Sequence, residues 1–183
     1  TDGRLWLFVG RFVPNKCQHD VVRAFAAYRR KADPGATLLL IGSAFTGTYR
    51  DAVIELAGRL QVADGLIARG PVTSAELTAC FQAADVFVCL SEHEGFCVPL
   101  VEAMAAGLPV VAYAAAAVPE TAGDAAVLLD QKDPVLVGAT VAELLDDDST
   151  REALVQRGFQ RAEALSPEKG RRILTDLVQG LVV

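Results

Sequence analysis

The chain has 183 residues, of which 52% are hydrophobic and 22% charged, and its formal net charge is −6. This composition excludes intrinsic disorder, and the length suits one domain that can bury a large core without disulfides. The acidic balance argues against nucleic acid or an anionic membrane as the main partner, because both repel a negative protein surface.

Short apolar runs follow one another along the chain, at residues 5–9, 37–41, 66–68, 86–90 and 109–113. Each run is continuous rather than alternating, which is typical of strands covered on both faces. Amphipathic stretches separate the runs, and apolar side chains recur there at helical spacing, as Val21, Phe25 and Tyr28 do. Thr73-x-x-Glu76 forms a capping box before the third helix. This alternation predicts an α/β fold with a Rossmann-like, doubly wound parallel sheet.

Beyond Leu129 the pattern changes to three successive helix starts, at Asp133-Pro134, Ser149-x-x-Glu152 and Ser166-Pro167. We expect the C-terminal third to be helical and to pack on the outside of the sheet. Neither an internal repeat nor a linker is visible, so residues 1–183 are predicted to form a single domain with extra C-terminal helices. The first strand begins at residue 5, and this early start indicates a piece of a longer protein.

Neither the apolar stretches nor the cysteines indicate a membrane-spanning or secreted protein. The longest nearly unbroken apolar stretch, residues 108–119, is well short of the roughly 20 residues of a spanning helix, and no signal peptide is visible. Cys17, Cys80, Cys89 and Cys97 form no C-x-x-C pair, which argues against a structural zinc site and a disulfide framework. We therefore expect a reducing, cytoplasmic setting and no bound metal.

The end of the first predicted strand carries two cations that suit a phosphate. The strand ends in Gly10-Arg11, and the next helix is predicted to open near Asn15-Lys16. Such folds bind ligands at the carboxyl ends of their strands. Arg11 and Lys16 would flank a helix N-terminus, whose free N–H groups attract anions. The alternative is two solvated surface cations, and no P-loop or dinucleotide fingerprint is present.

The end of the fourth predicted strand carries two glutamates on different elements. Glu94 belongs to the loop after the strand, and Glu102 belongs to the next helix. Gly95 permits close approach of the backbone to a ligand, and residues 96–100 form a second helix N-terminus. Two carboxylates beside two anion-binding helix ends suit a sugar joined to a diphosphate. Taken singly, each glutamate is more simply a capping or solvated residue.

Three further features near these strand ends have simpler interpretations. His93 is either a general base near neutral pH or a structural residue behind the loop, and His19 is expected at the surface. Cys97 lies near the predicted crevice, but it lacks a partner base and is not expected to act as a nucleophile. The acidic run at residues 146–148 is expected to be a solvated helix end.

The segment from Glu94 to Val111, EGFCVPLVEAMAAGLPVV, resembles the E-x7-E signature of retaining glycosyltransferases of the GT-B type, family 4. Residues 9–16, VGRFVPNK, are similar to the donor-phosphate segment of that family, and residues 39–42, 69–72, 84–88 and 118–120 agree in order and spacing. The resemblance covers almost the whole chain. It implies half of a GT-B fold: the C-terminal, donor-binding domain of a two-domain enzyme whose N-terminal, acceptor-binding domain lies outside this sequence.

The resemblance also implies roles for the matching residues. Arg11 and Lys16 would hold the donor diphosphate, Glu94 would contact the sugar beside the anomeric carbon, and these three would be the catalytic residues. Glu102 would accept hydrogen bonds from the ribose. The other donor-binding positions are Gly10, the base-lining Arg69, Gly70 and Val72, and the backbone of Gly95, Phe96, Cys97 and Val98. Cys97 stands where this signature usually has glycine; a small residue is kept, so close approach of the backbone to the donor should survive, while the effect on sugar preference is open.

The implied reaction is transfer of a hexosyl unit from a UDP-, GDP- or ADP-linked sugar to an acceptor hydroxyl, with retention of configuration. The resemblance implies no metal or other cofactor, a role in polysaccharide biosynthesis, and a cytoplasmic enzyme or one held at the inner membrane face by the missing domain. The 183-residue chain alone is expected to bind donor weakly and to be inactive.

Other functions stay open at this point. One is a non-catalytic nucleotide-sugar-binding module, and another is a different GT-B enzyme, such as a nucleotide-sugar epimerase or a phosphorylase. A glycosidase that uses Glu94 and Glu102 as its carboxylate pair is disfavoured, because it would leave Arg11 and Lys16 without a role.

Overall fold

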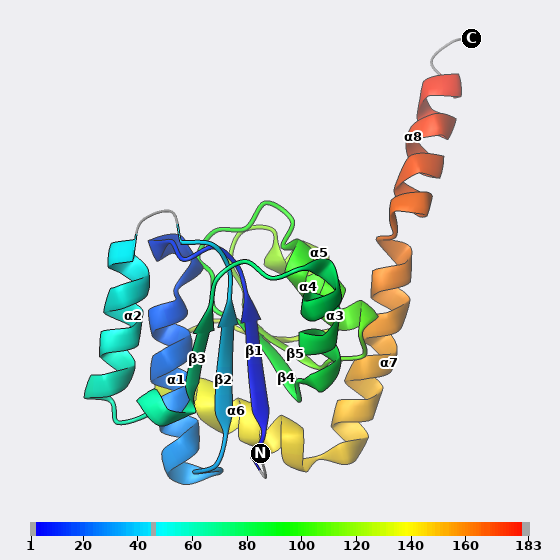
Figure 1. Ribbon diagram of the computed structural model, residues 1–183. Helices are drawn as coiled ribbons and strands as arrows, with labels where there is room; N and C mark the ends of the chain where they lie inside the picture. The colour runs from blue at the N-terminus through cyan, green and yellow to red at the C-terminus, as the bar shows by residue number, and fades with distance from the viewer. Residues whose placement is uncertain (1–2, 45–46, 181–183) are drawn as a thin grey trace.

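The computed structural model describes residues 3–44 and 47–180. Six parallel strands form one sheet in the order β3-β2-β1-β4-β5-β6 (Figure 1). Its strands are β1 (Leu5–Val9), β2 (Thr37–Ile41), β3 (Leu66–Arg69), β4 (Val86–Cys89), β5 (Val110–Tyr113) and β6 (Val127–Leu129). The order reverses direction between β1 and β4, so the α/β, Rossmann-like, doubly wound sheet predicted from the sequence is confirmed.

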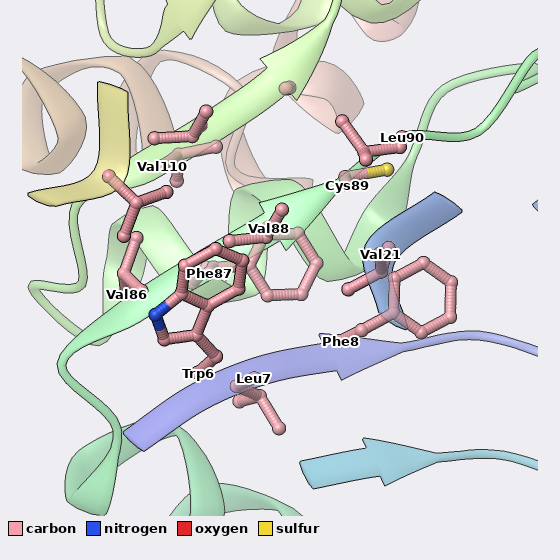
Figure 2. Close-up of a cluster of buried hydrophobic side chains, with 14 of the residues drawn as sticks. Trp6, Leu7, Phe8, Val21, Val86, Phe87, Val88, Cys89, Leu90 and Val110 are labelled. Carbon is pink, nitrogen blue, oxygen red and sulfur yellow. The ribbon is translucent and has the colours of Figure 1, made fainter. Parts of the chain in front are cut away.

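Burial on both faces explains why the apolar runs form strands. β1 pairs with β2 from Leu5↔Thr37 to Val9↔Ile41, and the large side chains of the central strands are almost fully buried. Trp6 and Phe87 are each at most 1% exposed, and Figure 2 shows the cluster that they form with side chains of β4 and β5. The Phe25 ring, on the first helix, packs against the Trp6 ring in a T-shaped arrangement, with the two ring centroids 5.7 Å apart. Aromatic packing therefore fixes this helix on the sheet.

The strand ends differ in small ways from the prediction. β3 continues to Arg69, β4 ends at Cys89 rather than at residue 90, and β5 begins at Val110 rather than at Pro109. Proline has no N–H to donate to the ladder, so it stands just outside the strand. The prediction missed β6, because three residues, Val127–Leu129, are too short to show a pattern.

The helices cover the sheet on two sides. Figure 1 shows α1 and α2 on one side of the sheet and α3, α4 and α7 on the other, with α6 packed on α1 and α7 packed on α4. The helices are α1 (Gln18–Lys31), α2 (Gly47–Arg59), α3 (Ser74–Ala83), α4 (Val98–Ala105), α5 (Val118–Ala122), α6 (Pro134–Asp146), α7 (Asp148–Ala164) and α8 (Pro167–Gly180). Short 3-10 helices, η1 (Pro14–Lys16) and η2 (Ala63–Gly65), precede α1 and β3.

Helix starts follow the capping chemistry of the sequence, with one shift. The Thr73 side chain and Glu76 form the predicted capping box of α3. The start of α7 is not at Ser149: the Asp147 carboxylate accepts a 3.1 Å hydrogen bond from the Thr150 N–H and caps the helix two residues earlier. The acidic run therefore joins two helices rather than simply ending one, and an N-terminal aspartate also suits the helix dipole.

The last helix departs most from expectation, because α8 does not pack on the sheet. It continues past the end of α7 and away from the rest of the domain (Figure 1). Its apolar side chains Ile173, Leu174, Leu177 and Val178 are between 52% and 62% exposed. In the part of the chain that the structure describes, none of the helices combines the length and the apolar character required to cross a membrane.

Candidate functional site

The candidate site lies where the sheet order reverses, between the loops that follow β1 and β4. These two loops are joined directly: the Glu92 N–H donates to the Asn15 carbonyl at 2.9 Å, and the Asn15 side-chain amide donates to the His93 carbonyl at 3.5 Å. The buried Gln18 amide donates to the Arg11 carbonyl at 2.8 Å and holds the first loop from behind. The crevice predicted at the strand ends therefore has a fixed backbone on both sides.

Gly42, at the end of β2, is packed against the backbone of the first loop. A Cβ atom built there would lie 2.0 Å from the carbonyl oxygen of Gly10. The Gly10 N–H in turn donates to the Ile41 carbonyl at 2.8 Å. Only a residue without a side chain allows the ends of β1 and β2 to lie this close together, so Gly42 determines the position of the Gly10-Arg11 turn relative to β2.

An ion pair crosses the site between the two loops. Lys16 Nζ lies 2.6 Å from Glu94 Oε2, and the two side chains are only 18% and 9% exposed. Lys16 is the last residue of η1, and α1 begins two residues later at Gln18, so the helix start is close to the predicted one. The structure thus brings together two of the three residues expected to be catalytic. Lys16 is held by a carboxylate rather than standing free for a phosphate.

Arg11 is exposed on the loop that follows β1. Within residues 3–44 and 47–180, its guanidinium forms none of the recorded ion pairs or hydrogen bonds. A planar guanidinium with its donors free is well suited to bind a phosphate through two parallel hydrogen bonds. Arg11 is therefore available to a ligand in a way that Lys16 is not.

Cys97 is the N-cap residue just before α4 and has a left-handed conformation, with φ of 63°. Its Sγ lies 3.9 Å from Sγ of Cys89, the last residue of β4. The hydrogen bond between these buried thiols lowers the pKa of Cys89 and raises the pKa of Cys97, and burial raises that of Cys97 further. The ligand atoms of Cys89, Glu94 and Cys97 all lie within 4.8 Å of one another. The sequence analysis placed Cys97 near the crevice but did not connect it with Cys89.

Glu102 is exposed on α4 and lies between two cavities. The first, of about 470 Å³, is formed with Ser74, Thr78 and Phe81 of α3. The second, of about 600 Å³, is formed with residues that include Phe96 and Val98. Neither of these two cavities is lined by Arg11, Lys16 or Glu94, so the predicted residues Phe96, Val98 and Glu102 line cavities that the Lys16–Glu94 pair does not reach.

The predicted base-lining segment reaches the first cavity indirectly. Arg69 is exposed at the end of β3, and its carbonyl accepts a 3.2 Å hydrogen bond from the Gly42 N–H. Gly70 has open space around it, and Val72 is half-buried just before the capping box of α3. This segment is followed directly by α3, which forms one wall of the cavity beside Glu102. Among the described residues, no hydrogen bond or ion pair joins the segment to the side chains of Lys16 and Glu94.

A second ion cluster supports the site, and the sequence analysis missed it. Lys132 Nζ lies 2.8 Å from both Asp20 Oδ2 and Glu92 Oε1, and 3.4 Å from Cys17 Sγ. Burial alone would lower the pKa of Lys132, but its hydrogen bonds to Asp20 and Glu92 raise it overall. Lys132 therefore ties the loop after β6 to α1 and to the loop of Glu94. No spacing rule signals it, because its partners are remote in the sequence.

The two histidines differ in their surroundings. His93 is exposed, and its recorded hydrogen bond is made by its backbone carbonyl rather than by its ring. His19, expected at the surface, is instead partly buried, with Nδ1 2.8 Å from the Tyr49 hydroxyl. The ligand atoms of Cys17, His19 and Asp20 also lie within 4.8 Å of one another. In that cluster, however, Asp20 is already paired with Lys132 and Arg23.

This sheet order, with charged side chains at the point where it reverses, defines the class of Rossmann-like domains that bind ligands outside the carboxyl ends of their strands. Comparison with known proteins identifies the family. The model of the family described as "Glycosyl transferases group 1" matches residues 1–161. The chain belongs to the group 1 glycosyltransferases, and its fold matches GT-B glycosyltransferases.

Three similar proteins illustrate the relationship. Over 162 residues the chain is 31% identical to the O-antigen chain mannosyltransferase B of Escherichia coli, with 88% of this chain and 42% of that protein covered. Sucrose-phosphate synthase from Thermosynechococcus elongatus has a TM-score of 0.86 at 26% identity, covering 99% of this chain and 46% of its own. Anabaena Alr3699/HepE, in complex with UDP and glucose, has a TM-score of 0.86 at 20% identity, covering 96% and 48%. The chain spans less than half the length of each.

Proposed function

We propose that this domain binds a nucleotide-diphosphate sugar and, together with a separate acceptor-binding domain, transfers a hexosyl unit to an acceptor hydroxyl with retention. The observation that carries the proposal is the Lys16–Glu94 ion pair at the point where the sheet order reverses. It places a cation and a carboxylate together where a diphosphate and a sugar would meet. Membership of the group 1 glycosyltransferases supports the same reaction class.

The diphosphate is assigned to Arg11, Lys16 and the N-terminus of α4. Arg11 supplies free donors, and Lys16 supplies a charge that Glu94 holds in place. The Val98 N–H opens α4 beside the same loop and adds the positive end of the helix dipole. Fixed donors of this kind stabilise negative charge that develops on a departing nucleotide.

The nucleoside is assigned to the cavity between α3 and α4. Its volume, about 470 Å³, is in the range of small-ligand pockets. The Glu102 carboxylate is exposed at its edge, where it can accept hydrogen bonds from two ribose hydroxyls. The base would then lie toward α3 and the backbone of residues 69–72. This places the sugar between Glu102 and Glu94, on the loop that carries Gly95 and Phe96.

In the proposed reaction the bond between the anomeric carbon and the diphosphate oxygen breaks, and its electron pair leaves with the nucleotide. The acceptor oxygen bonds to the anomeric carbon and gives its proton to the departing diphosphate oxygen. Glu94 contacts sugar hydroxyls beside that carbon, while Arg11 and Lys16 face the leaving group. Because these side chains supply the positive charge themselves, we propose that donor binding requires no metal, and chelation with EDTA should not weaken nucleotide binding.

Calorimetric titration with UDP, GDP and ADP tests the donor site. UDP is the first ligand to try, because the Anabaena protein of the same fold contains it. We expect one nucleotide to bind selectively and Glu102→Ala to weaken it about tenfold, as the loss of a charged hydrogen-bond acceptor would. Glu143→Ala, an exposed glutamate on α6, is the matched control and should bind normally. Equal binding by the two variants would contradict the nucleoside assignment.

Transfer itself is tested in the protein that also carries the acceptor-binding domain. There Glu94→Gln should bind nucleotide but transfer about a hundredfold more slowly, because an interaction with the reacting sugar is lost. Wild-type rates in this variant would remove Glu94 from the proposed mechanism. Product analysis separates the alternatives: a glycoside supports transfer, an altered nucleotide sugar indicates an epimerase, and a sugar phosphate indicates a phosphorylase. The 183-residue chain alone should transfer nothing.

A further inference from the structure

The two thiols and the carboxylate at the end of β4 form a buried cluster of potential metal ligands. Cys89 is 2% exposed, Cys97 5% and Glu94 9%, and their ligand atoms lie within 4.8 Å of one another. We propose that Cys89, Cys97 and Glu94 together bind a thiophilic divalent cation of the Zn²⁺ class. The sequence analysis argued against a zinc site because it found no C-x-x-C pair; in this cluster seven residues separate the cysteines, and the carboxylate comes from the loop between them.

The distance between the thiols favours a shared metal over a disulfide. Tetrahedral Zn²⁺ with sulfur ligands at about 2.3 Å places the two sulfurs about 3.8 Å apart. The observed Sγ–Sγ distance is 3.9 Å. A disulfide needs about 2.05 Å, so it would require Cys89, fixed in the sheet, and Cys97, fixed at the start of α4, to approach much more closely. A metal fits the thiols as they stand.

The charges of the surroundings also suit a divalent cation. Two thiolates and one carboxylate would carry three negative charges in a buried place, which is costly unless they are compensated. The cation supplies two positive charges, and Lys16, 2.6 Å from Glu94 Oε2, supplies the third. We assign the cation to Glu94 Oε1, because Lys16 already occupies the other oxygen. The occupied site is then neutral.

The fourth ligand of a tetrahedral site is assigned to Ser91 or to water. Ser91 is fully buried, and its Oγ accepts a 3.4 Å hydrogen bond from Cys89 Sγ. The other three-residue cluster, at Cys17, is a weaker competitor. There the Asp20 carboxylate is paired with Lys132 and Arg23, and Nδ1 of His19 is 2.8 Å from the Tyr49 hydroxyl.

Co²⁺ titration of the reduced chain tests the site, because cobalt thiolates give charge-transfer bands and tetrahedral cobalt gives strong visible bands. We expect both bands to saturate at about one equivalent and Zn²⁺ to abolish them by displacement. Cys97→Gly should weaken Co²⁺ binding tenfold or more without loss of fold, because glycine suits the φ of 63° at this position. Circular dichroism and thermal melting confirm that the variant is folded.

Two control variants separate this site from the other thiols. Cys17→Gly removes the second cluster, and Cys80→Ser removes a cysteine on α3; both should keep the wild-type Co²⁺ spectrum. Three results would overturn the proposal: absence of the bands in the fully reduced wild-type chain, their persistence in Cys97→Gly, or their loss in Cys17→Gly alone. None of these readouts depends on nucleotide binding.

The site also predicts a coupling, which rests on the proposed function. A cation on Glu94 withdraws this carboxylate from the donor sugar, so Zn²⁺ should weaken binding of UDP-glucose tenfold or more in the wild type and not in Cys97→Gly. If UDP-glucose fails to bind even the metal-free chain, the proposed donor is wrong while the cobalt result stands. If Zn²⁺ leaves UDP-glucose affinity unchanged, the coupling is wrong.

Discussion

Lys16 and Glu94 are 78 positions apart in the sequence, yet their charged atoms lie 2.6 Å apart across the loops of β1 and β4. Each side chain is mostly buried, so if one partner is removed, water cannot fully solvate the charge that is left. The pair therefore serves the fold and the proposed site at once. A ligand that binds here has to accommodate a charge pair that is already formed.

Removal of either partner should cost stability. We expect Lys16→Met and Glu94→Gln each to lower the free energy of unfolding by about 1–3 kcal/mol, and the double variant to cost less than the sum, because the remaining partner is no longer left unpaired. Urea denaturation at neutral pH measures all four corners of the cycle. The exposed Arg59–Glu55 pair of α2 is the matched control and should show no measurable coupling. If the stability costs of Lys16→Met and Glu94→Gln are additive, the two side chains do not stabilise each other, and the prediction is wrong.

Arg11 should matter for ligands and not for stability. Arg11→Ala is expected to weaken binding of the preferred nucleotide by about 10- to 100-fold, the usual range for a lost charge-assisted hydrogen bond. Its thermal midpoint should match the wild type, because the side chain is exposed. Arg30→Ala on α1, equally exposed, controls for the change in net charge. A similar loss in both variants would show a general electrostatic effect instead of a contact.

Gln61 follows α2 in a left-handed conformation, with φ of 60°. Residues other than glycine are strained there, and the side chain is exposed, so little is lost by removing it. We expect Gln61→Gly to raise the free energy of unfolding by about 0.5–1 kcal/mol. Gln61→Ala keeps the strain and should bring no gain. The prediction fails if both variants change stability equally.

Alkaline pH should destabilise the domain through Tyr28. Burial raises the pKa of Tyr28 to about 12, whereas an unfolded tyrosine ionises near 10. Above pH 10 the unfolded chain therefore binds fewer protons, and stability falls until the pH passes the folded pKa, by at most about 1.4 kcal/mol per pH unit. Denaturant titrations between pH 9 and 12 should show a shallower decline in Tyr28→Phe than in the wild type, and parallel declines would contradict this assignment.

The sheet was predicted well because a strand that is buried on both faces appears in the sequence as a continuous apolar run. Apart from Thr37 at the start of β2, the runs that form β1, β2 and β4 are apolar at every position, and the Thr73–Glu76 box marks a helix start that the structure confirms. By contrast, the three residues of β6 are too few for any pattern. The Ser166-Pro167 helix start predicted α8, but the packing on the sheet expected for this helix does not occur, because a helix-start signal does not show what covers the helix.

For the candidate site, the sequence likewise predicted the residues but not the contacts between them. Arg11, Lys16, Glu94 and Glu102 were found because each follows a predicted strand, and that rule depends on topology alone. Which of them touch was not predictable. The contact of Lys16 with Glu94, the bridge from Lys132 to Glu92 and the approach of Cys89 to Cys97 all depend on how far each loop extends.

The glycine at the end of β2 gives the site a point of control outside itself. Because a Cβ atom at Gly42 would overlap the Gly10 carbonyl, even a methyl group there would displace the turn that carries Arg11. The affinity of the domain could thus be tuned from a strand that touches no ligand. Substitutions at Gly42 would then mimic the loss of a contact residue while every such residue is still present.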